Sequence, residues 1–319
     1  MKIIDINEMR DRFANELKAR RVNNQPDSYA DQCGDGQRLY GIVGAVHTHA
    51  ALGLNIGDKT VRQSLAQNIL SYVDKQDQFI DEQTSGPAHA LACSVAALNL
   101  LGAPLPATLG PLAPTDPNAL DGWLNQLDWA TTHKPLWGST ALLLASGLVN
   151  SQWIKTFTQH INKRLDHPDP QQALYRLSGA PWRIVSEIYH VMSALDAGCI
   201  AYPQHKRLAD QLLALNWDDP QVAEKQTMCT DADWAWLLQQ LLRHCPEISE
   251  EAYRQIRKVS ARRVTQWHEQ SDVLLEVRTF DFYSFLWSTA VYQRAVPDHF
   301  TGPALLDTLN MPALFRLYR

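Results

Sequence analysis

Residues Cys229–Leu238 read Cys-Thr-Asp-Ala-Asp-Trp-Ala-Trp-Leu-Leu, which places two acids at the start of an otherwise apolar helix. The residues that follow Asp231 at helical spacing are Trp234, Ala235, Leu238, Leu241 and Leu242. Asp231 therefore heads a stripe that we expect to face the core. Charged side chains avoid such positions unless they are paired, cap a helix or serve a function.

A capping role for these acids competes with a functional one. Thr230 followed three residues later by Asp233 has the spacing of a capping box, in which the two side chains bind each other's backbone N–H groups. Acids in a first helical turn also suit the helix dipole. The sequence alone leaves both interpretations open.

The rest of the chain repeats the helical pattern, and almost no stretch alternates with the period of two that marks a strand. The predicted helices are Asp5–Arg21, Leu39–Leu54, Val61–Val73, His89–Leu101, Leu120–Ala130, Trp137–Val149, Trp153–Leu165, Trp182–Ala197, Lys206–Leu215, Asp231–Arg243, Glu250–His268, Asp281–Arg294 and a short Met311–Tyr318 tail. Apolar helices rich in small residues alternate with more polar ones.

This alternation predicts an inner set of helices covered by an outer set. The inner helices begin near Leu39, His89, Trp137, Trp182 and Asp231, because these segments are apolar on all sides. Either an open solenoid or a closed barrel of helical hairpins would produce such a pattern. We expect an all-α fold, an α/α toroid with a central cavity. It forms a single domain over residues 1–319, with residues 1–36 packed on it as an N-terminal helix and a polar connection.

Composition narrows the class of protein. The chain has 319 residues, of which 45% are hydrophobic and 20% charged, so it can bury a sizeable core. A net charge of -5 without a long basic run disfavours a nucleic-acid partner. No apolar stretch is long enough to span a bilayer, and the N-terminus lacks a signal-peptide pattern. Five cysteines without a Cys-x-x-Cys pair favour a cytoplasmic location.

Three motifs in order resemble a known superfamily. They are Gly86-Pro-Ala-His89 before Ala97-Leu-Asn-Leu-Leu-Gly-Ala-Pro104, Gly179-Ala-Pro-Trp-Arg183 before Tyr189-His190, and Cys229-Thr-Asp-Ala-Asp233. Together they resemble an uncharacterised bacterial branch of the α/α-toroid superfamily, which includes terpenoid cyclases and protein prenyltransferases. The resemblance extends from about Leu39 to Arg243. It implies a closed ring of helical hairpins, with a cavity reached from the end where the inner helices begin.

The chemistry of that superfamily matches this chain only in part. Class II terpenoid cyclases carry an Asp-x-Asp-Asp motif whose middle Asp protonates the substrate. Here Asp231 and Asp233 match its first two acids, and Trp234 stands in place of the last. Prenyltransferases hold zinc with an Asp, a nearby Cys and a distant His, and here Cys229 precedes Asp231, which is the opposite order.

Asp233 is the candidate general acid. A carboxylic acid protonates an alkene or a leaving oxygen only if it stays neutral, and burial can keep it so. His190 is the candidate group that tunes its strength, and Asp231 is the second candidate catalytic acid. The alternative is that Asp233 only caps its helix.

The histidines suggest a second kind of site. His47 and His49 point about 200° apart on one helix, so at most one of them faces a cavity. His47 and His89 are candidate substrate contacts. Zinc held by Cys229, Asp231 and a histidine is conceivable, although no cofactor is required by the sequence. Histidines satisfied by neighbouring polar groups are the alternative.

Further candidate substrate contacts lie on the helix that begins near Trp182. Arg183, Glu187 and His190 share one helical face, where Arg183 and Glu187 either pair with each other or bind a polar substrate. Trp182 and Trp234 could line a pocket for an apolar skeleton or a sugar ring. The alternative for both tryptophans is packing in the core.

Three functions remain open on these grounds. The leading one is an enzyme that uses a cavity acid to cyclise an apolar, isoprenoid-like substrate. The second is a glycan-processing hydrolase or lyase, because helical-barrel enzymes of that kind also combine carboxylates with aromatic platforms. The third is a non-catalytic binding or assembly protein. The expected partner is therefore a small molecule or a glycan.

Overall fold

The chain folds mainly into α-helices. The computed structural model describes residues 2–80, 87–104, 113–127, 149–165, 181–197, 200–202, 204–217, 229–306 and 308. These residues form eleven α-helices and one small sheet of two strands, which confirms the all-α prediction. The chain divides into two compact units, which are described separately.

Unit 1 combines segments from both ends of the sequence. It consists of Met1–Tyr72, Ala97–Ala103 and Gln226–Leu309. Its elements are β1 (Ile4–Asp5), α1 (Ile6–Ala19), η1 (Val22–Asn24), α2 (Leu39–Ala51), α3 (Lys59–Leu70), α12 (Thr230–Leu241), η3 (Pro246–Ile248), α13 (Ser249–Glu276), α14 (Thr279–Ala295), η4 (Pro297–His299) and β2 (Phe300–Thr301). Strand β1 pairs with β2 in parallel, with Ile4 opposite Phe300. The sequence did not predict this pair, because two residues are too short to show an alternating pattern.

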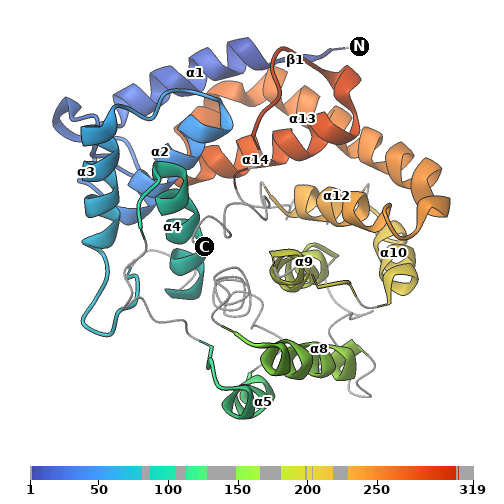
Figure 1. Cartoon of the computed structure of the whole chain (residues 1–319). Coiled ribbons are helices and arrows are strands. Elements are labelled where there is room, and N and C mark those ends of the chain that lie inside the picture. Colours follow the sequence, from blue (N-terminus) through green and yellow to red (C-terminus); the bar gives the residue numbers. More distant parts are fainter. Residues whose placement is uncertain are drawn as a thin grey trace. The chain divides into compact units, whose positions relative to one another are not determined.

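Helices α2 and α14 lie side by side in the middle of unit 1 (Figure 1). Both are buried on nearly every side. Gly44 makes their close approach possible, because a Cβ atom there would lie only 2.7 Å from the Cα atom of Phe280. Next to this contact, the rings of Tyr40 and Phe280 meet edge to face, with centroids 4.5 Å apart. The sequence predicted α2 as an inner helix but did not include α14 among the inner helices.

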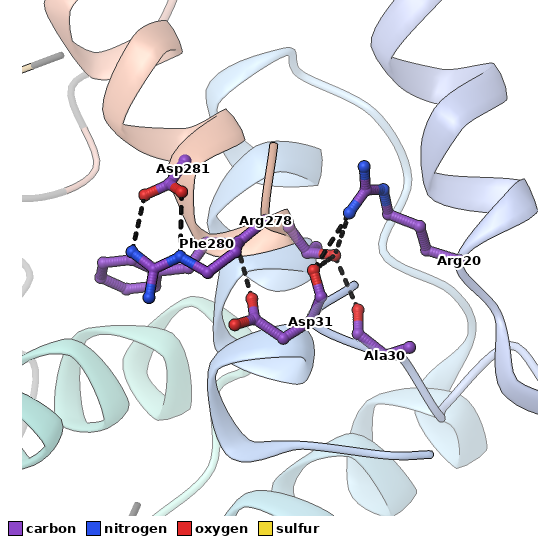
Figure 2. A network of polar contacts seen from close by, with 7 residues as sticks. Arg20, Ala30, Asp31, Arg278, Phe280 and Asp281 are labelled. Atoms are coloured by element: carbon purple, nitrogen blue, oxygen red, sulfur yellow. Dashed lines mark hydrogen bonds and ion pairs between the residues drawn. The ribbon is translucent and has the colours of Figure 1, made fainter. Parts of the chain in front are cut away.

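The first turn of α14 is held by the segment that follows α1 (Figure 2). The carbonyl oxygen of Asp31 accepts a hydrogen bond from the Thr279 backbone N–H at 2.7 Å, and its carboxylate accepts one from the Phe280 N–H at 3.3 Å. Buried Arg20 donates to the same Asp31 carbonyl at 3.0 Å. Two of the N–H groups that a helix start leaves unpaired are thus satisfied by a residue far away in sequence.

Helices α1 and α13 each bury one face, as their amphipathic patterns predict. Asp5 caps α1 by accepting a hydrogen bond from the Asn7 N–H at 2.9 Å. Phe13 of α1 packs against Trp267 of α13 and Phe282 of α14, with ring centroids 6.1 and 5.1 Å away. This aromatic cluster joins three helices of unit 1.

Unit 2 consists of Val73–Ala96, Pro104–Lys225 and Asn310–Arg319. Its described helices are α4 (Pro87–Leu101), of which residues 97–101 belong to unit 1, α5 (Pro117–Gln126), α8 (Ser151–Leu165), α9 (Pro181–Ala197) and α10 (His205–Leu213). Helices α5 and α8 pack together. The indole of Trp153 on α8 is buried and donates to the Pro114 carbonyl at 2.8 Å, which ties α8 to the segment before α5.

The predicted helices agree with the observed ones to within a few residues at most ends, and α13 runs eight residues beyond its predicted end at His268. Residues 137–148 and the tail at 311–318, both predicted as helical, lie outside the described residues. Closure of the helices into a toroid and the single-domain organisation stay predictions.

Candidate functional site

The predicted acidic pair lies at the N-terminus of α12 in unit 1. The helix begins at Thr230, so Thr230 is its first residue and Cys229 is its N-cap. No side chain caps the helix through a hydrogen bond from the N-cap position, and the predicted capping box between Thr230 and Asp233 is therefore wrong. The reason is that the helix starts one residue earlier than a capping box requires, which places Thr230 in the first turn instead of at the N-cap.

Asp231 forms a buried ion pair with Arg263 of α13. The guanidinium Nη2 and Nε atoms lie 2.5 and 3.1 Å from the two carboxylate oxygens. Both side chains are less than 10% exposed, at 4% for Asp231 and 9% for Arg263. The Ala232 N–H donates a further hydrogen bond to Asp231 at 3.0 Å. Three donors on one carboxylate favour its charged form.

Asp233 is in the opposite situation. It is 2% exposed, and its carboxyl group makes no hydrogen bond or ion pair among the described residues. Burial, and then the negative charge of Asp231, raise the pKa of Asp233 well above its usual range. Both effects favour the neutral, protonated form of the Asp233 side chain.

Tyr292 of α14 adds a polar group to this site. Burial, and then the charge of Asp231, raise the pKa of the Tyr292 phenol well above its usual range. Its hydroxyl is buried and lies near the Asp231 carboxylate. Tyr292 therefore offers a neutral hydroxyl donor beside the acidic pair.

The helix that carries the pair is deeply buried. Helix α12 is buried on every side from Thr230 to Leu238, including Trp234 and Trp236. The prediction of a single core-facing stripe headed by Asp231 is therefore too narrow, because both faces of the helix are covered. This burial on all sides is the character predicted for an inner helix.

Arg263 and Tyr292 were not predicted from the sequence. Arg263 could have been recognised by its position, because it is a cation within a buried stripe of α13. That stripe comprises Ile256, Val259, Ser260, Arg263, Val264 and Trp267. A cation at such a position requires a buried acidic partner. Nothing local distinguished Tyr292 from the other aromatic residues of α14.

The two neighbouring histidines of α2 face different parts of unit 1, as predicted from their spacing. His47 is fully buried, with its ring 4.9 Å from the Tyr283 ring of α14. His49 lies 3.5 Å from the Tyr29 hydroxyl. Burial, and then the charge of Arg21, lower the pKa of His49 to about 4. The role of His47 as a substrate contact stays a prediction.

His190 and His89 belong to unit 2, whereas the acidic pair belongs to unit 1. The Nδ1–H of half-buried His190 donates to the Ser186 carbonyl at 2.6 Å, since a carbonyl oxygen only accepts. His89 lies within 4.0 Å of the Cys93 sulfur one turn later on α4. Tuning of Asp233 by His190, and substrate contact by His89, stay predictions.

Three other predicted contacts lie on α9. The side chains of Trp182, Arg183 and Glu187 are outside the described residues. The predicted face shared by Arg183, Glu187 and His190 is therefore described only at His190.

A zinc site around Cys229 and Asp231 is not supported by the described part of the chain. Within it, no group of three or more His, Cys, Asp or Glu side chains could hold a metal ion. Arg263 also occupies both carboxylate oxygens of Asp231, which a metal would need.

The arrangement of the two acids defines the chemistry available here. Asp231 is ion-paired with Arg263, whereas Asp233, two residues later, lies in an environment that favours its neutral form. Environments that separate the pKa values of neighbouring acids are typical of acid–base sites. The neutral acid can donate a proton, and the fixed carboxylate can stabilise positive charge that follows.

No described helix has both the length and the apolar character that a membrane span requires. Comparisons with protein-family models, with curated proteins and with solved structures found no match to the chain. The resemblance to the α/α-toroid superfamily therefore stays a prediction that depends on the three motifs quoted above.

Proposed function

We propose that this chain is an enzyme in which Asp233 acts as a general acid on an apolar, isoprenoid-like substrate. The observation that carries the proposal is the state of Asp233 itself. It is a fully buried carboxylic acid without a partner among the described residues, and it stands two residues from an ion-paired carboxylate. A structural acid in such a place would normally be paired, because burying an unpaired polar group costs free energy.

The buried tryptophans of α12 favour alkene protonation over proton transfer to a polar leaving group. Trp234 and Trp236 of α12 are buried on the same helix, and aromatic faces stabilise cations through their negative ring surfaces. A carbocation formed by protonation would also be attracted to the Asp231 carboxylate. In the class II cyclases that the motif resembles, the acid that protonates the substrate occupies the position of Asp233.

We further propose that the helices close into an α/α toroid that encloses the substrate in its centre. The burial of α2, α12 and α14 on nearly all sides supports inner-ring positions for these helices. A cytoplasmic location belongs to the same proposal. It is supported by four free cysteines in the described residues, which suit a reducing compartment.

The test is an assay of purified protein with farnesyl diphosphate, geranylgeranyl diphosphate and squalene, with products separated by gas chromatography and identified by mass spectrometry. We expect cyclic products from the wild type and a loss of about two orders of magnitude or more in Asp233→Asn, the usual scale for losing a general acid. Asn has nearly the same volume as Asp, so the fold should persist.

Asp31→Asn is the matched control. Asp31 is also a buried acid of unit 1, and Asn keeps an oxygen that can accept from the Phe280 N–H. This variant should keep its turnover. Equal turnover by wild type and Asp233→Asn would overturn the acid role. Release of reducing sugars from a polysaccharide panel, with no isoprenoid converted, would instead favour the glycan-processing function.

A further inference from the structure

We propose that Arg263 is the positioning residue of the acidic pair: it holds Asp231 as a carboxylate, and this fixed negative charge keeps Asp233 protonated. The inference deepens the proposed function and rests on it, because it explains how Asp233 stays protonated until it reacts with a substrate. The protonation state can be measured without a substrate, so the two proposals can fail separately.

The geometry of Arg263 supports the first half of the inference. Its planar guanidinium donates hydrogen bonds to both Asp231 carboxylate oxygens, from Nη2 at 2.5 Å and from Nε at 3.1 Å. The guanidinium also lies 5.9 Å from the centre of the Phe285 ring, which holds its plane from α14. The two guanidinium donors and the Ala232 N–H bind a carboxylate more strongly than a protonated carboxyl group, so together they favour the charged form of Asp231.

The isolation of Asp233 supports the second half. Both acids lie in the first turn of α12, but the cation that neutralises Asp231 makes no hydrogen bond or ion pair with Asp233 among the described residues. Ionising Asp233 would therefore place a second negative charge in a buried turn where Arg263 is already bonded to Asp231. Retaining the proton avoids this cost.

Other charged or titratable groups also face the pair. Helix α13 contributes half-buried Arg262 beside Arg263, α14 contributes Tyr292, and the N-cap of α12 contributes Cys229. Arg263 is distinguished from these groups because it alone is bonded to Asp231 through two atoms in the described structure. It is therefore the residue whose removal should change the number of protons on the two acids.

The experiment follows the carboxyl groups of the full chain by infrared spectroscopy and by carbon-13 NMR of protein labelled at aspartate. The wild type should show one buried protonated carboxyl at pH 7, and this signal should vanish in Asp233→Asn. Arg263→Gln should add a second protonated carboxyl, which disappears again in Arg263→Gln combined with Asp231→Asn. Arg263→Lys keeps the cation and should leave a single protonated carboxyl.

Asp231→Asn tests the second step directly and preserves side-chain volume. Without the neighbouring negative charge, Asp233 should lose its proton at a lower pH, by about one pH unit or more, which is a tenfold change in proton affinity. Arg20→Gln is the matched control, because it also removes a buried arginine of unit 1 that pairs elsewhere. It should lower the melting temperature without changing the carboxyl signals.

A purely structural ion pair would lower the melting temperature in the Arg263 and Asp231 variants and leave the titration of Asp233 where it is. That result would overturn the inference, as would a single protonated carboxyl in folded Arg263→Gln. If Arg263→Gln does not fold, two other measurements test the role of Arg263. They are the titration of Asp233 in Asp231→Asn and the number of protonated carboxyl groups in Arg263→Lys. Normal protonation changes without conversion of any isoprenoid would leave Arg263 as the positioning residue and contradict only the proposed reaction.

Discussion

The backbone N–H of Thr279 donates a hydrogen bond to the carbonyl oxygen of Asp31 at 2.7 Å, although the two residues stand 248 positions apart. The Thr279 hydroxyl also donates to the Ala30 carbonyl at 2.7 Å, and every group involved is buried. The start of α14 and the segment after α1 therefore form one hydrogen-bonded joint. Its stability should depend on each partner.

Thr279→Val should lower the free energy of unfolding by about 1–3 kcal/mol. Valine fills the same space but leaves the buried Ala30 carbonyl without that donor. Urea denaturation measures the difference. Thr265→Val is the matched control, because the Thr265 hydroxyl bonds the Ala261 carbonyl on an exposed face of α13. It should change the free energy by less than about 0.5 kcal/mol, and similar losses in both variants would contradict the joint.

Gly44→Ala should destabilise the protein by about 1–3 kcal/mol, the usual cost of overpacking a core. The added methyl group would meet backbone atoms of Thr279 and Phe280 at 2.7 Å, and backbone cannot move aside as a flexible side chain can. Gly122→Ala in α5 meets nothing within 4 Å and should be stabilising by up to about 1 kcal/mol through helix propensity. Thermal melts of both variants give the comparison, and a neutral Gly44→Ala would show that α2 and α14 pack less closely.

Asp233→Asn should change how stability depends on pH. The raised pKa of Asp233 means that the folded protein keeps a proton which the unfolded chain releases above about pH 4. The wild type should therefore lose stability as pH rises from about 4 to the folded pKa, by up to about 1.4 kcal/mol per pH unit. Asp233→Asn should lack this slope. Parallel stability curves for the two proteins would mean that Asp233 is ionised in the fold.

His49→Gln should remove a slope of opposite sign. The pKa of His49 falls to about 4 in the folded protein, whereas an unfolded histidine titrates near 6.5. The native state thus loses stability as pH falls from about 6.5 to 4, by at most about 1.4 kcal/mol per pH unit, and is unaffected above that window. Denaturation across this window should be flatter for His49→Gln, while substitution of exposed His244 by Gln should leave the slope in place.

The helices of this protein were predictable from the sequence because their apolar periodicity is a local property. Leu39–Leu54 and Asp231–Arg243 were recognised as buried helices from composition alone, and α2 and α12 occupy these segments. The β1–β2 pair and the cap that Asp31 provides for α14 were not predictable, since both depend on partners distant in the chain. Such pairings are set by tertiary packing.

The candidate site was predictable in part for the same reason. The helical spacing predicted that Asp231 heads a core-facing stripe, and the structure shows that both Asp231 and Asp233 are buried. The sequence could not tell which acid was paired, because Arg263 lies 32 positions from Asp231 on another helix. The division between a charged and a neutral acid became visible only with that partner in place.

Unit 1 is assembled from segments near both ends of the sequence, and this has a consequence for biosynthesis. Helix α2 leaves the ribosome long before α14, because the residues from Ala51 to Thr279 must be translated in between. At about 5–20 residues per second, that delay is on the order of ten to fifty seconds. Throughout it, a helix that is apolar on nearly every side lacks the surface against which it packs. The nascent chain should therefore depend on chaperones during this interval more than a protein whose core helices are neighbours in sequence.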